Sequence, residues 1–362
     1  MRGRENLQSE LFSYFVCPEE RVPAKHPLRL IKADVERVLQ SMSPEFDKLY
    51  KKRGRPSIPP EQLLKGILLM ALFSIRSERQ FCEQLEYNVL FRWFLEMTWD
   101  EASFTHSAFS KLRARMESDD LSLSFFNKVV GLAKERGLLT EDHFTVDGTL
   151  IEAWASHKSF RPKDDSGDKP DDKGDRNFKG EKRRNDTHQS TTDPEAQIMR
   201  KGPGKEAKLS YGAHCLMENR NGLVVGMLVT QATTPEPEAA EALVKAWLES
   251  GESLETLGAD KGYHTKGFVQ ALRGLGIAPH LAMITGRRTP GLDGRTTRHA
   301  SYKMSQVRRK LVEEVFGWAK VVGGIRKSRF VGKLKTSIAT LFVSAAYNLR
   351  RLASIATQLA AA

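Results

Sequence analysis

The feature that most constrains the fold is a pair of long apolar segments joined by Asn221-Gly222. The stretch reads KLSYGAHCLMENRNGLVVGMLVTQA, so a polar turn interrupts two runs of apolar residues. Asn-Gly between two such runs is the strongest short-range signal for a β-hairpin. The sequence therefore predicts two antiparallel strands, and a chain that contains them must build a sheet.

The segments around the hairpin predict the rest of that sheet. HFTVDGTLIEA alternates, with Phe144 and Val146 on one face and Thr145, Asp147 and Thr149 on the other, as in a strand. After the hairpin, EPEAAEALVKAWLES and TKGFVQALRGLG are typical of helices, whereas ETLGAD and IAPHLAMI are typical of short strands. We expect an α/β fold in which helices cover the faces of a mixed sheet.

The first part of the chain is different, because its pattern is helical from about residue 30 to residue 136. PPEQLLKGILLMALFSI opens with Pro59 and Pro60, which suit the start of a helix. ERQFCEQLEYNVLFRWFLEM continues with apolar residues at helical spacing, and SFTHSAFSKLRARM follows, with Ser103 or Thr105 as its cap. We therefore predict an all-α N-terminal domain over residues 1–136 and an α/β domain over residues 137–362.

A polar tract over residues 161–208 interrupts the second domain. It holds 13 basic and 11 acidic residues and almost no large apolar side chain. Such a segment cannot bury enough apolar surface to fold by itself. We expect a long loop or insertion that becomes ordered, if at all, on a bound polyanion.

Positive charge is concentrated near the C-terminus. The whole chain of 362 residues carries 57 Lys and Arg against 45 Asp and Glu, a net charge of +12. Residues 286–336 alone hold 14 basic and 3 acidic residues, so nearly all of the excess lies there. A basic stretch of this kind favours a polyanionic partner, with nucleic acid as the first candidate.

Several other classes of protein are disfavoured. Cys17, Cys82 and Cys215 are scattered without the spacing of a zinc site or a disulfide framework, which fits a reducing cytoplasm. The N-terminal segment has no uninterrupted apolar run of the signal-peptide kind. The longest apolar run, ILLMALFSI, is shorter than the roughly 20 residues of a membrane span, so we expect a buried helix and no membrane association.

Three carboxylates stand out as candidate site residues. Asp147 lies in a strand that is otherwise apolar, and Asp260 directly follows another strand. Glu313 lies in RRKLVEEVFGWAKVVGG, where Arg309, Glu313 and Lys320 fall on one stripe of a predicted helix. The alternatives are two hydrogen-bonded turn aspartates and an ordinary amphipathic helix with an Arg309–Glu313 pair. Those alternatives do not explain why the flanks of Glu313 are so one-sidedly basic.

Two aspartates and a glutamate suit one chemistry well. Hard carboxylate oxygens bind Mg²⁺ or Mn²⁺ together with water and phosphate oxygens. Two such ions about 4 Å apart can activate a nucleophile and stabilise the leaving oxygen of a phosphodiester displacement. Basic neighbours would then bind the phosphate backbone of the substrate.

Several long segments together resemble the bacterial insertion-sequence transposases with an Asp-Asp-Glu site, in the IS-five group, which is related to the IS-four group. KKRGRPSIPPEQLLKGILLMALFSIRSERQFCEQLEYNVLFRWFLEM resembles the helical N-terminal region of that group. VDGTLIEAWASHKSFRPKD and GADKGYHT resemble its two aspartate segments, and TDPEAQIMRKGPGKEAKLSYGAHCLMENRNGLVV its hairpin region. RRKLVEEVFGWAK resembles its glutamate signature, Tyr-x2-Arg-x3-Glu-x6-Lys, except that Gln306 occupies the tyrosine position.

The resemblance implies a ribonuclease-H-like fold and a transposase that uses two Mg²⁺ ions, or Mn²⁺. Asp147, Asp260 and Glu313 would be the catalytic metal ligands. The enzyme would bind the terminal inverted repeats, hydrolyse the DNA ends and join the freed 3′-hydroxyls to target DNA. Paired-end chemistry implies at least a homodimer on double-stranded DNA.

DNA contacts are expected from seven further residues. The resemblance assigns the backbone near the scissile phosphate to Arg309 and Lys320, and Lys261 and Tyr263 adjoin the second aspartate. Tyr263 could stack on an unpaired base, or simply pack on the sheet. The remaining three candidates come from the basic segments around residues 157–163 and 308–310, and they are Lys158, Arg161 and Arg308.

Two other function classes stay open at the level of the sequence. One is a non-catalytic DNA-binding relative that uses the same basic surface. The other is a ribonuclease-H-like nuclease that cuts DNA without strand transfer. The helical N-terminal region and the basic C-terminal stretch favour recognition of DNA ends, and so the transposase.

Overall fold

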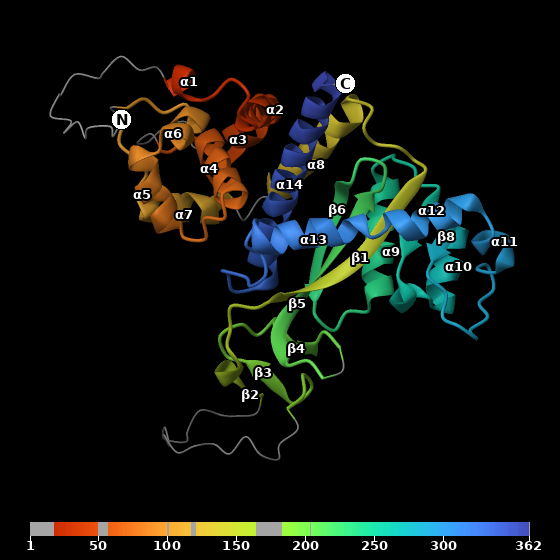
Figure 1. The fold of residues 1–362 in the computed structure, drawn as a ribbon. Coiled ribbons are helices and arrows are strands. Elements are labelled where there is room, and N and C mark those ends of the chain that lie inside the picture. Colours follow the sequence, from red (N-terminus) through yellow and green to blue (C-terminus); the bar gives the residue numbers. More distant parts are fainter. Residues whose placement is uncertain are drawn as a thin grey trace, which may run out of the picture.

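The computed structural model describes residues 18–49, 57–99, 101–116, 121–163, 183–202 and 204–361. Parts of two predicted regions lie outside these residues. They are residues 1–17, 50–56, 100 and 117–120 of the helical domain and residues 164–182 and 203 of the polar tract. Figure 1 shows a helical region and a sheet, with two long helices between them.

Eight helices form the described part of the first region, as predicted. They are α1 (Pro18–Arg21), α2 (Leu28–Ser41), α3 (Ser43–Leu49), α4 (Pro60–Leu72), α5 (Glu78–Tyr87), α6 (Val89–Leu95), α7 (His106–Met116) and α8 (Leu121–Glu135). Thr105 rather than Ser103 caps α7, because its Oγ1 accepts a hydrogen bond from the Ala108 N–H at 3.3 Å. Asn88 caps α6 by accepting from the Phe91 N–H at 3.2 Å, which separates α5 from α6.

Six strands form the main sheet. They are β1 (His143–Glu152), β4 (Gln197–Arg200), β5 (Ala207–Glu218), β6 (Leu223–Gln231), β7 (Thr256–Ala259) and β8 (Ala278–Leu281). The order is β4-β5-β1-β7-β8, and β6 also pairs with β5. The predicted hairpin is confirmed, since β5 and β6 are antiparallel and Gly222 at their turn has φ +67°. β7 and β8 run parallel to β1, so the sheet is mixed and ribonuclease-H-like.

The remaining helices cover the sheet. They are α9 (Glu236–Glu249), α10 (Lys266–Gly274), α11 (Gly294–Thr297), α12 (Ala300–Arg308), α13 (Leu311–Val321) and α14 (Lys333–Ala361). α9 packs on β5, β6 and β1, and α10 lies beside α9 and β8. α12 packs on β7 and β8, and α13 crosses β1 on its way to α14 (Figure 1).

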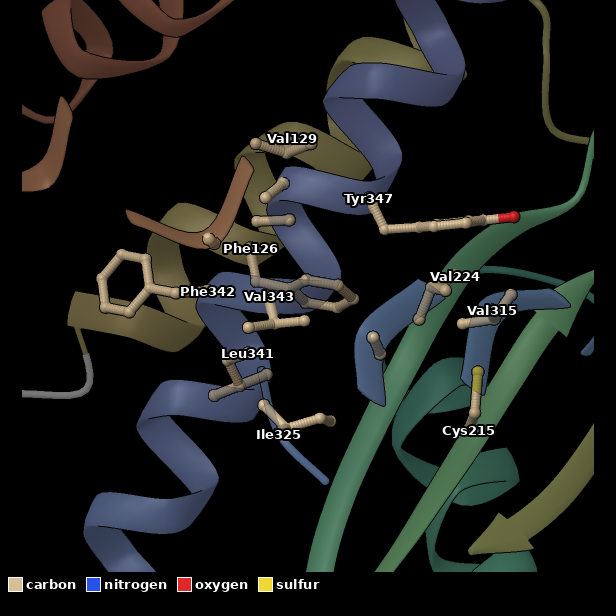
Figure 2. Close-up of a cluster of buried hydrophobic side chains, with 14 of the residues drawn as sticks. Phe126, Val129, Cys215, Val224, Val315, Ile325, Leu341, Phe342, Val343 and Tyr347 are labelled. Atoms are coloured by element: carbon tan, nitrogen blue, oxygen red, sulfur yellow. The ribbon is translucent and has the colours of Figure 1, made fainter. Parts of the chain in front are cut away.

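One hydrophobic core connects the helical region with the sheet. Figure 2 shows Phe126 from α8 and Phe342 and Tyr347 from α14 in one cluster with Val224 of β6. Asn348 fixes this packing, because its side chain accepts from the Val224 N–H at 2.9 Å and donates to the Val224 carbonyl at 2.7 Å. α14 also packs on α2 and α4. The division at residues 136 and 137 stays a prediction.

The second half of the polar tract is ordered, so the expectation of a loop is wrong there. β3 (His188–Ser190) pairs with β2 (Phe160–Pro162) in a small second sheet, and β4 extends the main sheet along β5. Buried Asp193 accepts a hydrogen bond from the Tyr211 hydroxyl at 2.6 Å. The open edge of β5 offers backbone partners to this polar segment, which composition alone does not reveal.

Among the described residues, none of the helices could span a membrane bilayer.

Candidate active site

Strand register brings Asp147 and Asp260 together. β1 and β7 are parallel, and their last paired residues are Thr145 and Gly258. Asp147 lies two residues after the first and Asp260 two residues after the second. In parallel strands about 4.8 Å apart, residues at matching positions are neighbours. Because β7 ends at Ala259, the edge of β1 beside Asp147 is left open.

Asp147 lies among other negative charges. Burial, together with the charges of Asp260 and Glu313, raises the pKa of Asp147 to about 6. A hydrogen bond of 2.8 Å from the Gly148 N–H and the positive charge of Arg309 act in the opposite direction. Asp260 and Glu313 are thus close enough to Asp147 for their charges to raise its pKa.

The helix that carries Glu313 is shorter than predicted. Arg309 and Lys310 form a turn between α12 and α13, and Glu313 lies in the first turn of α13. The prediction that Arg309, Glu313 and Lys320 form one stripe on a continuous helix is therefore wrong. The break lets α12 lie along β7 and β8 while α13 crosses β1, which places exposed Glu313 near Asp147. The apolar side of α13 is buried, with Val315 and Trp318 in the core.

Hydrogen bonds fix the two basic residues of the signature, Arg309 and Lys320. Gln306 accepts a hydrogen bond from Arg309 Nε at 3.1 Å and donates to the His280 carbonyl at 2.5 Å. It thereby links Arg309 to the end of β8. Lys320 donates to Thr149 Oγ1 at 2.5 Å, two residues along β1 from Asp147. Desolvation and the nearby cations Lys201 and Arg326 lower the pKa of Lys320.

Tyr263 does not offer its ring to DNA. Its side chain is fully buried and packs against Phe268, with 5.9 Å between ring centroids. The prediction of base stacking is wrong for this conformation, and the alternative of a tyrosine packed in the fold describes it. Lys261, two residues earlier, is exposed in the short 3-10 turn η2 (Lys261–Tyr263).

The other three residues predicted to contact DNA lie at other places in the fold, away from the three carboxylates. Lys158 and Arg161 are exposed in and after the turn η1 (His157–Ser159), next to the small β2–β3 sheet (Figure 1). Arg308 lines a cavity with Asp142 and His143, at the start of β1. The structure therefore brings Arg309, Lys320 and Lys261 to the carboxylates, and does not bring these three there.

Glu236 is a neighbour of the site that the sequence did not single out. It begins α9, and its carboxylate lies over Gly148 and Gly262. Partial desolvation and the charges of Asp260 and Asp147 raise the pKa of Glu236. Its only signal in the sequence is an acidic residue in the first turn of a helix, which is common because such residues stabilise the helix dipole.

The donor chemistry of this site fits a divalent cation. Asp147, Asp260 and Glu313 supply carboxylate oxygens, the ligands that Mg²⁺ and Mn²⁺ prefer. No ion pair neutralises any of the three within the described residues. Over the same residues, no group of three or more His, Cys, Asp or Glu side chains is drawn together as metal ligands. The site thus has suitable donors that are neighbours without being closed around one point.

Two models of known families match the chain. One, described as a transposase domain (DUF772), matches residues 16–115. The other, described as a transposase DDE domain, matches residues 140–349, more than half of the chain. The chain belongs to the DDE transposase family. The carboxylates Asp147, Asp260 and Glu313 all fall inside the matched DDE domain.

Three solved structures are weakly similar to the chain, and they represent two different proteins. A piggyBac transposase synaptic complex with hairpin DNA is 9% identical, with 92% of this chain and 76% of that chain covered and a TM-score of 0.40. A Mos1 transposase paired-end complex with the left transposon end is 10% identical, with coverages of 76% and 81% and a TM-score of 0.21. Comparison with curated proteins finds no match.

Proposed function

We propose that this DDE transposase binds the terminal inverted repeats of an insertion sequence, cleaves the ends and joins the 3′-hydroxyls to target DNA. The observation that carries the proposal is the juxtaposition of Asp147 and Asp260 by strand register, with Glu313 brought over β1 by α13. These three residues come from distant segments of the matched DDE domain. Their shared location without neutralising partners supports a common role.

In this proposal Asp147, Asp260 and Glu313 hold two Mg²⁺ ions, for which Mn²⁺ can substitute. Such ions, when bound, polarise the phosphate and lower the pKa of an attacking water or hydroxyl. Arg309 and Lys320 bind phosphate oxygens on either side of the carboxylates, and Gln306 orients Arg309. Lys261, Lys158, Arg161 and Arg308 extend the contact along the DNA backbone.

Membership in the IS-five group, a cytoplasmic location and a dimer or larger assembly on double-stranded DNA belong to the same proposal. The piggyBac and Mos1 structures are described as a synaptic and a paired-end complex, each with DNA. In this proposal an assembly of two or more copies pairs the two DNA ends for cleavage and joining. A non-catalytic DNA-binding relative and a nuclease without strand transfer are the competing functions.

The test is a cleavage and joining assay. The purified protein is incubated with DNA that carries the flanks of its own gene, with a supercoiled target and Mg²⁺. The Asp260→Asn variant and a reaction with EDTA run in parallel. We expect end cleavage and joined donor–target products that disappear in both controls.

The other outcomes would favour a competing function or contradict the assigned carboxylates. End binding without cleavage in the wild-type protein would contradict the proposal in favour of a non-catalytic relative. Metal-dependent cleavage without any joined product would favour the nuclease. Cleavage that survives Asp260→Asn would show that the assigned carboxylates are wrong.

A further inference from the structure

Glu236 reaches the site from a different layer of the fold than the three signature carboxylates. It is the first residue of α9, which packs on the sheet beside β1 and η2. Its Oε1 atom lies 3.0 Å from the position that a Cβ at Gly148 would occupy. Its Oε2 atom lies 3.4 Å from the corresponding position at Gly262. The carboxylate thus spans the distance between the two aspartate segments.

The two glycines make this approach possible. Gly148 directly follows Asp147, and Gly262 follows Asp260 by two residues. The point where a Cβ at Gly262 would lie is also 3.0 Å from Asp260 Oδ1. A side chain at either glycine would press on Glu236 or on its aspartate neighbour. The backbone therefore leaves room for a carboxylate at this place.

Nothing in the described part of the chain neutralises Glu236. Its carboxylate has no hydrogen bond or ion pair to a described residue, although Lys245 and Glu241 of the same helix form an ion pair at 2.7 Å. Stabilisation of the helix dipole explains an acidic residue in the first turn of α9. It does not explain why the side chain is directed at two other acids, which repel it.

Two buried polar atoms independently mark the same space. His214 Nδ1 lies 3.1 Å from the Cβ position at Gly148, and it has no hydrogen-bond partner among the described residues. The Tyr263 hydroxyl is fully buried, is close enough to Glu236, Asp147 and Asp260 to interact with their charges, and also lacks a partner there. Buried polar groups in native proteins are nearly always hydrogen-bonded. Their presence next to Glu236 indicates a polar occupant of the space between α9 and β1.

We infer that Glu236 is a fourth carboxylate of the active site and holds a divalent cation together with Asp147 and Asp260. This inference rests on the proposed function, because it assumes that the aspartates bind metal. A cation between these carboxylates would offset their mutual repulsion. Glu236 would then position the ion from the α9 side, while Glu313 acts from the α13 side.

The experiment measures Mn²⁺ binding by the full-length protein, with calorimetry and the electron paramagnetic resonance of free Mn²⁺. Glu236→Gln removes the charge and keeps the shape of the side chain. Glu238→Gln is the matched control, because it removes an exposed charge from the same helix turn. Asp147→Asn tests the proposed metal site itself, and thermal melting confirms that each variant is folded.

We expect Glu236→Gln to raise the Kd for Mn²⁺ by about tenfold or more. Glu238→Gln should stay within about twofold of wild type, because Glu236 and not Glu238 is the carboxylate nearest to Gly148 and Gly262. In cleavage assays the Glu236→Gln variant should need more Mn²⁺ for half-maximal rate, and excess Mn²⁺ should restore part of the rate.

The remaining outcomes separate the two proposals. Weak Mn²⁺ binding in Asp147→Asn with wild-type affinity in Glu236→Gln would overturn the role of Glu236 and leave the proposed function standing. Equal losses in Glu236→Gln and Glu238→Gln would assign the effect to helix charge and also overturn it. Wild-type affinity in Asp147→Asn would contradict the metal site of the proposed function, and the inference with it.

Discussion

Acidic side chains of the helical region are paired with cations, whereas those at the candidate active site of the sheet are not. In the helical region, buried Lys65 lies 3.0 Å from Glu96 and 3.5 Å from Glu36, and Lys32 bonds the same two acids. Asp34 of α2 is buried against Arg136 in a two-bond ion pair. At the sheet, four carboxylates gather with no ion pair among the described residues. Paired charges stabilise the first region, whereas unpaired charges in the second are available for a cation.

In the helical region even a fully buried cation, Arg92, has hydrogen-bond partners. It is 1% exposed, and its guanidinium donates to the carbonyls of Leu85, Thr98, Trp99 and Glu101. These carbonyls belong to the end of α5 and to the segment after α6. A single buried cation therefore satisfies backbone acceptors that would otherwise be stranded.

The largest expected effect concerns the unpaired carboxylates. Glu313→Gln should lower the rate of end cleavage on the order of a thousandfold, since it removes a charge on which metal binding and catalysis depend. Its melting temperature should not fall, because Glu313 is exposed and lies near other negative charges. Gel-based cleavage kinetics and a thermal melt measure the two quantities.

Glu314→Gln is the control for that experiment, because Glu314 is the exposed neighbour of Glu313 on α13. It should cleave at close to the wild-type rate. Equal losses in the two variants would remove the distinction between a site carboxylate and a surface charge.

The next effect concerns stability in the helical region. Arg92→Met should lower the free energy of unfolding by about 3 kcal/mol, because it leaves the buried Leu85 carbonyl and the partly buried carbonyls after α6 without their donor. Urea unfolding measures this loss, and Arg79→Met at an exposed position of α5 should change stability by less than about 0.5 kcal/mol. A stability loss for Arg92→Met no larger than for Arg79→Met would show that the hydrogen bonds of Arg92 do not stabilise the fold.

A smaller effect appears in the pH dependence of stability. Burial lowers the pKa of His280 to about 4, and the charges of His143, Arg273 and His299 act in the same direction. Below about pH 6.5 the unfolded chain gains a proton at this position and the folded protein does not. The free energy of unfolding should therefore fall between pH 6.5 and pH 4, by roughly 2 kcal/mol at pH 5 from this group alone.

The helical region should respond at lower pH. Although partial burial acts the other way, hydrogen bonds from Lys65 and Lys32 lower the pKa of Glu96 to about 2. Its contribution is present above about pH 4.5 and is lost as the pH falls toward 2. His280→Asn should make the fall between pH 6.5 and pH 4 smaller, with the remainder due in part to His214, whose pKa burial also lowers to about 4. His299→Asn, at an exposed position, should leave the fall unchanged. A flat wild-type curve over that range would contradict the assignment to His280.

The smallest effect concerns Lys320, a basic residue at the candidate active site. Lys320→Gln should weaken binding of the DNA ends by less than about tenfold and lower the salt dependence of log K by about one. Fluorescence anisotropy at several salt concentrations measures both. Lys245→Gln, whose lysine is paired with Glu241 on α9, should leave the slope unchanged. An unchanged slope for Lys320→Gln would mean that Lys320 does not contact phosphate.

Local sequence signals predicted much of the fold. Asn221-Gly222 predicted the hairpin, and the apolar run before Asp260 predicted the strand that positions it. Periodicity also predicted α9 and α10, which pack beside the sheet. These features depend on residues close together in the chain, so a short window of sequence contains the information.

Features that depend on tertiary neighbours were missed or wrong. β4 forms from a polar segment because β5 offers it an edge, and the helix around Glu313 breaks at Arg309 and Lys310 as α12 and α13 follow different strands. Burial of Tyr263 and the approach of Glu236 both depend on how α9 and η2 pack together. The identities of Asp147, Asp260 and Glu313 as metal ligands stay a prediction.

The most direct test of the account is to locate the cation. Crystals of the protein with a DNA end and Mn²⁺ would be examined by anomalous scattering at the manganese edge. The account predicts at least one manganese peak about 2.0 to 2.3 Å from carboxylate oxygens of both Asp147 and Asp260. Manganese bound elsewhere, with these carboxylates instead paired to protein cations, would contradict it.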